Sequence, residues 1–279
     1  MPPRAQRPFR VLTAFVAALG LAACGNRNLT PSIAGAAGVP GYLAAATAYT
    51  PTPTSPSAHA VVVAAHAYAA NSAGTDLPVL TTPPVATPAH DALVLVQVLT
   101  QSPATLQAVQ DNRGNVYAPI GSLQTYSDQR AGTALFVGRD VQGGAGQTWS
   151  LVKAQGHGAD EASLYVVVVS GASGVGAWGF SNTTPYNLRT PLETTAADSL
   201  VVSFWGPADY SGSARDPYNP YFAPTGWTLG GQNDNGYDQC SGAYAWVRVV
   251  AAHTVLDPQW SSKKSVKANG SMWLVEVRR

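Results

Sequence analysis

The chain has few charged residues, few cysteines and no cluster of basic residues, and each shortage excludes a class of protein. Charged residues make up 11% of its 279 residues, less than half of the usual ~25%, which argues against a charge-rich disordered protein and against a coiled coil or helical bundle. With a formal net charge of +1, we expect no nucleic-acid partner. Two cysteines cannot build a disulfide framework or a cysteine-rich zinc site.

The N-terminal segment, residues 1–23, has the pattern of an export signal. Arg4, Arg7 and Arg10 precede an apolar run from Val11 to Ala23. A helix of this length rises only ~20 Å, which is too short for a hydrocarbon core of ~30 Å. We therefore predict a signal peptide and not a transmembrane span.

The end of this segment resembles the lipobox of bacterial lipoproteins. In Leu21-Ala22-Ala23-Cys24 an apolar residue and two small residues precede a cysteine. The resemblance implies cleavage between Ala23 and Cys24, lipid on Cys24 and a membrane anchor. Gly25, standing where Asp would retain a lipoprotein in the inner membrane, implies the outer membrane of a two-membrane bacterium. An ordinary signal peptide with an incidental cysteine is the alternative.

Two further regions follow the signal peptide. Residues 24–57 are rich in Gly, Ala, Pro and Thr, and their repeated prolines predict an extended stalk behind the lipid. Residues 58–279 contain about ten short β-branched or aromatic runs separated by Gly, Pro, Asn and Asp. This spacing predicts one all-β domain, an antiparallel jelly-roll or immunoglobulin-like sandwich of roughly ten or more strands.

Two patterns inside this domain predict local structure. In the last run, alternation places Trp273, Val275 and Val277 on one face of a strand and Met272, Leu274, Glu276 and Arg278 on the other. A weak internal echo, Ala-x-Asp-small-Leu-Val, occurs at 89–94 and at 196–201. We expect each aspartate, Asp91 and Asp198, to accept backbone N–H groups at a turn that leads into a buried strand.

Several stretches between residues 87 and 279 are similar to a diffuse group of bacterial and phage β-sandwich domains. They include the hairpin from Asp111 to Tyr117, the dipeptide Thr148-Trp149, and the tripeptides Gly226-Trp227-Thr228 and Pro258-Gln259-Trp260. The resemblance implies a sandwich of the kind found in surface and adhesin-like proteins, with no established common activity. It also implies that Trp227 is a core residue at the start of a strand.

The sequence contains no recognisable catalytic motif, so we predict no catalytic residue, no metal ligand and no cofactor. The five histidines are scattered, and Asp160-Glu161 sits in a Gly-rich stretch where we expect both to be solvated. A hydrolase of carbohydrates acting through paired carboxylates remains an alternative. The run 233–238 resembles part of a calcium loop, but Gly231 and Gly242 stand where an EF-hand needs Asp and Glu. Calcium bound in another way also remains an alternative.

The segment 207–239 departs most from a plain scaffold because it has no strand pattern and mixes aromatic with amide and carboxylate side chains. A sugar-binding surface needs this mixture, since pyranose rings stack on aromatic faces while hydroxyls need paired polar groups. The same mixture suits a protein contact, or a loop pinned onto the sandwich without a ligand. The candidate ligand-binding residues are Tyr210, Asp216, Tyr218, Asn219, Tyr221, Asn233, Asp234 and Tyr237. A second candidate face is formed by Tyr244, Trp246 and Arg248.

Together these patterns predict a lipid-anchored, non-catalytic binding or adhesion module of the cell envelope, with a glycan or an envelope protein as its partner. The alternatives are the carbohydrate hydrolase and a structural envelope protein without a ligand. Cys240 is left without a disulfide partner if Cys24 carries lipid, and we expect it to be buried.

Overall fold

The computed structural model describes residues 60–71, 76–126, 131–182, 189–206, 221–233, 240–262 and 270–279. All of them belong to one compact unit. The predicted signal peptide, the predicted cleavage and lipidation at Ala23 and Cys24, and the predicted stalk all lie outside the described residues.

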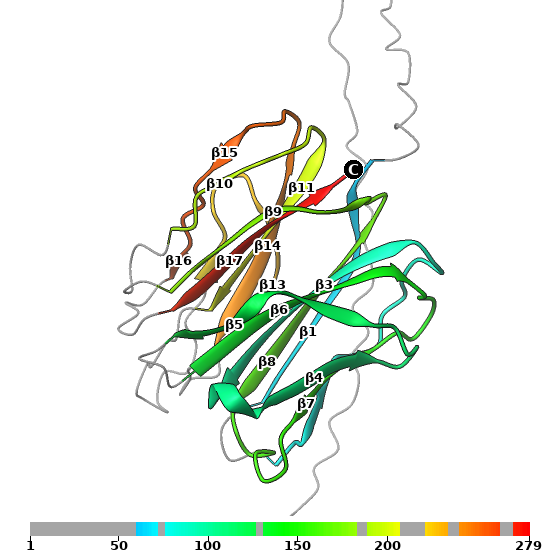
Figure 1. The fold of residues 1–279 in the computed structure, drawn as a ribbon, viewed down its shortest axis with the longest axis vertical. Helices are drawn as coiled ribbons and strands as arrows, with labels where there is room; N and C mark the ends of the chain where they lie inside the picture. The colour runs from blue at the N-terminus through cyan, green and yellow to red at the C-terminus, as the bar shows by residue number, and fades with distance from the viewer. Residues whose placement is uncertain are drawn as a thin grey trace, which may run out of the picture. The chain divides into compact units, whose positions relative to one another are not determined.

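Within these ranges the chain is all-β, with seventeen strands, one short 3-10 helix (Pro103–Thr105) and no α-helix. The predicted fold class and strand number are therefore confirmed. Two five-stranded antiparallel sheets form the sandwich (Figure 1). The first has the order β1 (Val62–Asn71), β8 (Ala162–Ser170), β3 (Ala92–Gln101), β6 (Ala131–Val141) and β5 (Tyr117–Tyr126). The second has the order β13 (Thr228–Asn233), β14 (Gly242–Val249), β11 (Ser199–Gly206), β17 (Ser271–Arg278) and β9 (Gly174–Ser181).

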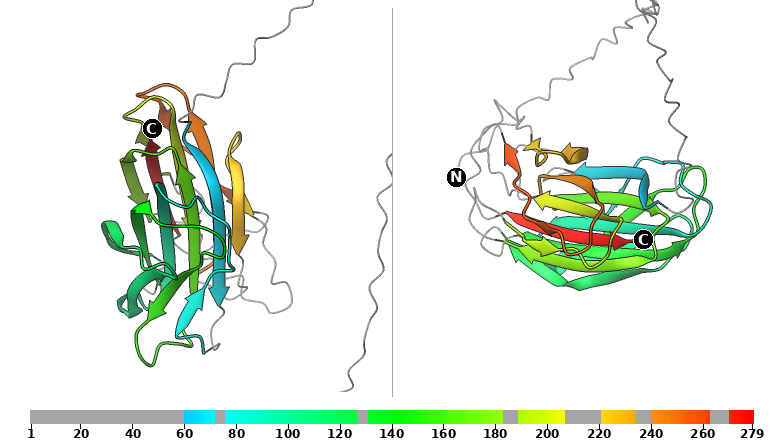
Figure 2. Two further views of the ribbon diagram at one scale, coloured as in Figure 1. Left: turned by 90° about the vertical axis from the view of Figure 1, so that its right-hand side faces the viewer. Right: turned by 90° about the horizontal axis from the view of Figure 1, so that it is seen from above.

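Smaller sheets cover the outer faces of the sandwich. A three-stranded sheet packs on the first large sheet, in the order β2 (Val79–Thr81), β7 (Trp149–Lys153) and β4 (Leu106–Asp111). The expected hairpin from Asp111 to Tyr117 is therefore wrong, because the turn joins two different sheets: β4 pairs with β7 and β5 pairs with β6. Two separate ribbons pack on the second: β10 (Leu192–Glu193) with β15 (Val255–Leu256), and β12 (Tyr221–Phe222) with β16 (Ser261–Ser262). The layering is visible in the side and top views (Figure 2).

The hydrophobic core follows these layers. The main cluster lies between the large sheets and joins residues such as Leu95 and Leu135 to Phe204 and Trp273. One cluster, built around Trp149, lies under the three-stranded sheet. Under the two ribbons the corresponding core is split into two clusters. The alternation predicted for β17 is confirmed: Trp273, Val275 and Val277 enter the main cluster, while Met272 and Leu274 enter the two outer ones.

The two halves of the chain have the same topology. If the second large sheet is read from its other edge, its order is β9-β17-β11-β14-β13, which matches β1-β8-β3-β6-β5 strand for strand. The pairing of β1 with β8 has a register shift between Val63 and Ala65. The corresponding pairing of β9 with β17 has a register shift between Val275 and Val277 of β17. The first half is residues 60–170 and the second half is residues 174–279.

The halves meet as an approximate twofold relation requires. Tyr68 of β1, in the first half, lies against Gly231 of β13 in the second. On the opposite side, Trp178 of β9 lies against Gly121 of β5. Since β9 matches β1 and β5 matches β13, the two contacts are equivalent, with the halves interchanged.

The internal echo lies at matching places in the two halves. Asp91 directly precedes β3 and Asp198 directly precedes β11, and their φ angles are 58° and 54°. The expectation that both carboxylates accept backbone N–H groups is wrong. Asp91 instead contacts His90, and the carboxylate of Asp198 contacts Arg248 and Arg279. The echo marks a shared backbone conformation at the start of each central strand.

Candidate functional site

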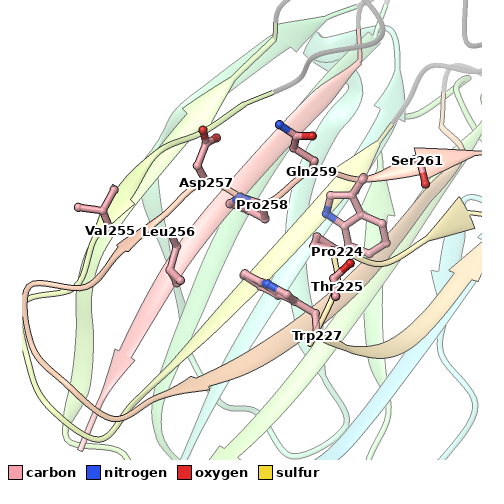
Figure 3. Close-up of a pocket in the computed structure, with 10 residues that line it drawn as sticks. Pro224, Thr225, Trp227, Val255, Leu256, Asp257, Pro258, Gln259 and Ser261 are labelled. Atoms are coloured by element: carbon pink, nitrogen blue, oxygen red, sulfur yellow. The ribbon is translucent and has the colours of Figure 1, made fainter.

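A groove of about 620 Å³ opens on the outer side of the second half (Figure 3). One wall is the turn between β12 and β13, and the other is the segment that joins β15 to β16. We call it the tryptophan groove. It is lined by Pro224, Thr225, Trp227, Val255, Leu256, Asp257, Pro258, Gln259, Trp260 and Ser261.

Trp227 is held in the first wall by a tight turn. Its N–H donates to the carbonyl of Pro224 at 3.0 Å, and Gly226 between them has a φ of +83°, which favours glycine. The indole of Trp227 is partly buried and packs against both outer clusters of the second half. The implied core position is therefore correct only in part, because the ring also lines the groove.

The second wall is fixed by Trp260. Its ring stacks on Trp205 with a centroid distance of 5.5 Å and an interplanar angle of 8°. Its indole N–H donates to the hydroxyl of Ser203 at 2.9 Å. Because Trp260 is 7% exposed, it anchors the wall and leaves Trp227 as the larger aromatic surface open to a ligand.

Polar groups lie beside the two tryptophans of the groove. Asp257 forms an ion pair with Arg189, and Thr225, Gln259 and Ser261 add hydroxyl and amide groups. Among the described residues, no hydrogen bond crosses from the turn at 224–227 to the segment at 257–260. The hydrogen-bonding groups on the two walls therefore do not satisfy one another.

Most of the predicted ligand-binding residues lie outside the described part of the chain, namely Tyr210, Asp216, Tyr218, Asn219, Asp234 and Tyr237. The two that are described do not line the tryptophan groove. Tyr221 is 1% exposed and packs edge-on against Trp205 at 5.1 Å, so neither face of its ring is open for stacking. Asn233 donates its side-chain amide to the hydroxyl of Ser163 at 3.3 Å.

The second predicted face is divided by the fold. Tyr244 is fully buried and shares a hydrogen bond of 2.8 Å with Nδ1 of His66. Burial raises the pKa of Tyr244 and lowers the pKa of His66. Trp246 and Arg248 line a second groove of about 360 Å³ together with Val61, Val62 and Val63. Arg248 also pairs with Asp198 at 3.0 Å.

Asp160 and Glu161 are less solvated than expected. Glu161 is 4% exposed, and Asp160 is partly buried with its carboxylate 2.9 Å from Nδ1 of His157, so neither is simply solvated. The carbonyl of Asp160 accepts from Nζ of Lys153, which also bonds the side chain of Asn71 and the carbonyl of Gly158. Burial lowers the pKa of Lys153. These contacts tie a loop to the sheet edge.

Within the described residues no three His, Cys, Asp or Glu side chains gather as a metal site would require. The same ranges contain no helix that is long and apolar enough to cross a membrane. Cys240 is buried, as predicted.

The motifs Gly226-Trp227-Thr228 and Pro258-Gln259-Trp260 were expected to belong to the scaffold. In the structure they lie on opposite walls of the tryptophan groove, which the sequence did not indicate. Pro258 is a signal for the break between β15 and β16, since proline interrupts strand pairing, but it does not indicate what faces that break. No protein-family model, curated protein or solved structure matches the chain.

Proposed function

We propose that this protein is an exported, lipid-anchored protein of the bacterial cell envelope, at the outer membrane, whose sandwich binds glycans without catalysis. The anchor is supported by the basic segment, the apolar run and the lipobox-like residues that end at Cys24. The binding role is supported by the tryptophan groove. The single observation that carries it is the partly open indole of Trp227 in a groove bordered by Asp257 and Gln259.

This arrangement matches the chemistry of a sugar ring. The C–H face of a pyranose packs on an indole, and its hydroxyls both donate and accept hydrogen bonds. Carboxylate, amide and hydroxyl groups around the groove supply both kinds of partner. A neutral glycan also suits a chain with so few charged residues.

A binding role fits the groove better than hydrolysis. Cleavage of a glycosidic bond by the usual mechanism needs two carboxylates on opposite sides of the bond. Among the described lining residues Asp257 is the only acid, and its carboxylate is already paired with Arg189.

Binding of the detergent-solubilised, full-length mature protein to an array of neutral glycans tests the proposal, followed by calorimetry with the glycans that bind. We expect Trp227→Ala to weaken binding by about two- to tenfold, because stacking contributes ~0.5–1.5 kcal/mol, and by more where the ring also buries apolar area. Phe222→Ala is the matched control, since Phe222 is 51% exposed and does not line the groove. Equal affinities of the two variants, or no glycan binding by the wild type, would reject the proposal.

A protein partner is the second candidate function, and the second groove favours it. Val62 is 47% exposed and borders this groove with Trp246, and an apolar recess next to an arginine is typical of protein contacts. Val62→Asp should weaken binding to such a partner and leave glycan affinity unchanged.

A further inference from the structure

We propose that the side chains of Lys153 and Asn71 join in an intramolecular amide bond, with release of ammonia, and that this bond fastens the end of β7 to the end of β1. The proposal goes beyond the proposed function, because it depends neither on glycan binding nor on the lipid anchor. It rests on the geometry of one buried lysine and one buried asparagine beside the loop at 154–161.

The two side chains are close together and shielded from water. Lys153 is the last residue of β7 and Asn71 is the last residue of β1. Nζ of Lys153 lies 3.3 Å from Oδ1 of Asn71, and the two residues are 3% and 4% exposed. A fully buried lysine is normally paired with a carboxylate, but the three hydrogen-bond acceptors of this Nζ are all neutral amide or carbonyl oxygens. Such surroundings favour the neutral amine over the ammonium ion.

The hydrogen bonds of Nζ leave its lone pair for Asn71. The carbonyls of Gly158 and Asp160 accept from Nζ at 2.8 and 2.9 Å, and these are its two shortest contacts. A neutral amine has two N–H groups and one lone pair, so these two carbonyls use both of its donors. The lone pair then faces the third and longest contact, which is the side-chain amide of Asn71. A separation of ~3–3.5 Å between reacting groups is typical of a near-attack geometry.

The electrostatic surroundings of Lys153 also favour the reactive form of the amine. Burial lowers the pKa of Lys153, and nearby acidic groups, of which Asp160 has the largest effect, raise it by less. A lysine whose pKa is lowered by burial has a larger neutral fraction at neutral pH and is a better nucleophile. The pKa supports the proposal that the distances and the burial carry.

The loop at 154–161 also holds the asparagine in place. Nδ2 of Asn71 donates to the carbonyl of Asp160 at 2.9 Å, and the same carbonyl accepts from Nζ of Lys153 at 2.9 Å. Because both nitrogens contact one oxygen, they lie close to each other. The loop itself is fixed, since the carbonyl of Gly158 also accepts from the N–H of Leu77 at 2.8 Å. The fold therefore brings the amine and the amide together before any reaction takes place.

The reaction is balanced without a further reactant. The bond between Nζ of Lys153 and Cγ of Asn71 forms, and the bond between Cγ and Nδ2 of Asn71 breaks. The proton that Nζ loses passes to Nδ2, which leaves as ammonia. The product is a secondary amide that closes a loop containing β2 to β7. Closing a loop restricts the unfolded chain as a disulfide does, and a chain with two cysteines, one of them predicted to carry lipid, has no disulfide to do this.

Tandem mass spectrometry of digested full-length mature protein tests the proposal, after incubation at about pH 9, where more of the amine is neutral. We expect a linked pair of peptides, one containing Asn71 and the other Lys153, whose mass is the sum of the two less one ammonia. Asn71→Asp should give the same linked pair with loss of one water instead. Lys153→Met removes the nucleophile and should give no linked pair. Asn112→Asp is the control, since Asn112 is exposed on a turn and its replacement should leave the link unchanged.

One side reaction must be told apart from the amide bond. Ring closure of Asn71 on the backbone N–H that follows it also releases ammonia, but it links no second peptide and persists in Lys153→Met. A wild type without a linked pair overturns the proposal, whether or not ammonia is lost. Loss of ammonia that is equal in Lys153→Met and in the wild type overturns it as well. If Lys153→Met does not fold, the wild type and Asn71→Asp decide, by the linked pair and by the exchange of ammonia for water.

Discussion

The indole of Trp178 lies directly against Gly121. A methyl carbon added at Gly121 would lie 2.7 Å from Cη2 of that ring, so the contact exists only because residue 121 has no side chain. The contact joins β9 to β5 at one side of the sandwich. Its counterpart on the other side is Tyr68 against Gly231, where an added carbon would lie 3.0 Å from the ring. The two large sheets are thus closed at both sides by an aromatic residue packed on a glycine.

Gly121→Ala should destabilise the protein because it combines two penalties. Residue 121 has a φ of +69°, which costs ~1–2 kcal/mol for a residue with a Cβ, and the clash with Trp178 adds ~1–3 kcal/mol. Gly114→Ala is the matched control, since its φ is +77° but nothing lies within 4 Å of the added carbon. Urea unfolding of both variants measures the difference, and equal losses of stability would contradict the role of the Trp178 contact.

Glu276→Gln should destabilise the protein by roughly 3 kcal/mol at pH 7. The carboxylate is fully buried and accepts from the backbone N–H groups of Ala177, Thr195 and Ala196 and from the hydroxyls of Thr195 and Ser199. Burial alone would raise the pKa of Glu276, but these hydrogen bonds outweigh it and lower the pKa to about 2. The side-chain NH₂ of glutamine would face these N–H and O–H groups and could not accept their hydrogen bonds.

The pH dependence of Glu276 follows from the direction of this shift. Because the pKa is lower in the folded protein than its ordinary value of 4.5, the stabilisation is complete above pH 4.5 and is lost as the pH falls toward 2. The difference in unfolding free energy between wild type and Glu276→Gln should therefore shrink over that range. A gap between wild type and Glu276→Gln that stays constant from pH 7 to pH 2.5 would refute the account.

Cys24→Ala should release the protein from the membrane. Lipid on Cys24 would contribute ~0.8 kcal/mol for each buried CH₂ group, and no other anchor is proposed. Membrane and soluble fractions are compared by detergent partitioning and immunoblotting. A variant that still fractionates entirely with the membrane would defeat the lipoprotein proposal.

The thiol of Cys240 should react only when the domain unfolds. It is fully buried in the main core cluster, between the two large sheets. In the Cys24→Ala variant it is the only thiol of the chain, so a colorimetric thiol reagent reports on it alone. We expect a reaction rate that rises with urea in parallel with unfolding. Rapid labelling in native buffer would show that the buried position is wrong.

Local sequence patterns predicted much of the fold because they report on single strands. The alternation in β17 required Trp273 and Val275 to face the same core, and both do. The repeated Ala-x-Asp pattern marked two turns of the same left-handed conformation. It did not reveal that whole halves of the chain share a topology, because strand order depends on pairing between segments far apart in the sequence, as in β1 with β8 and β9 with β17.

The sequence by itself determined the all-β class, the burial of Cys240 and the alternating faces of the last strand, since these depend on local hydrophobic period and turn chemistry. Only the tertiary structure decided which aromatic rings face a ligand. Tyr221 and Tyr244 are enclosed because other layers cover their strand faces, whereas Trp227 stays partly open where Pro258 divides the layer above it. The groove exists because the pairing of β12 with β16 brings the turn at 224–227 beside the segment at 257–260, and no pattern within either segment encodes that meeting.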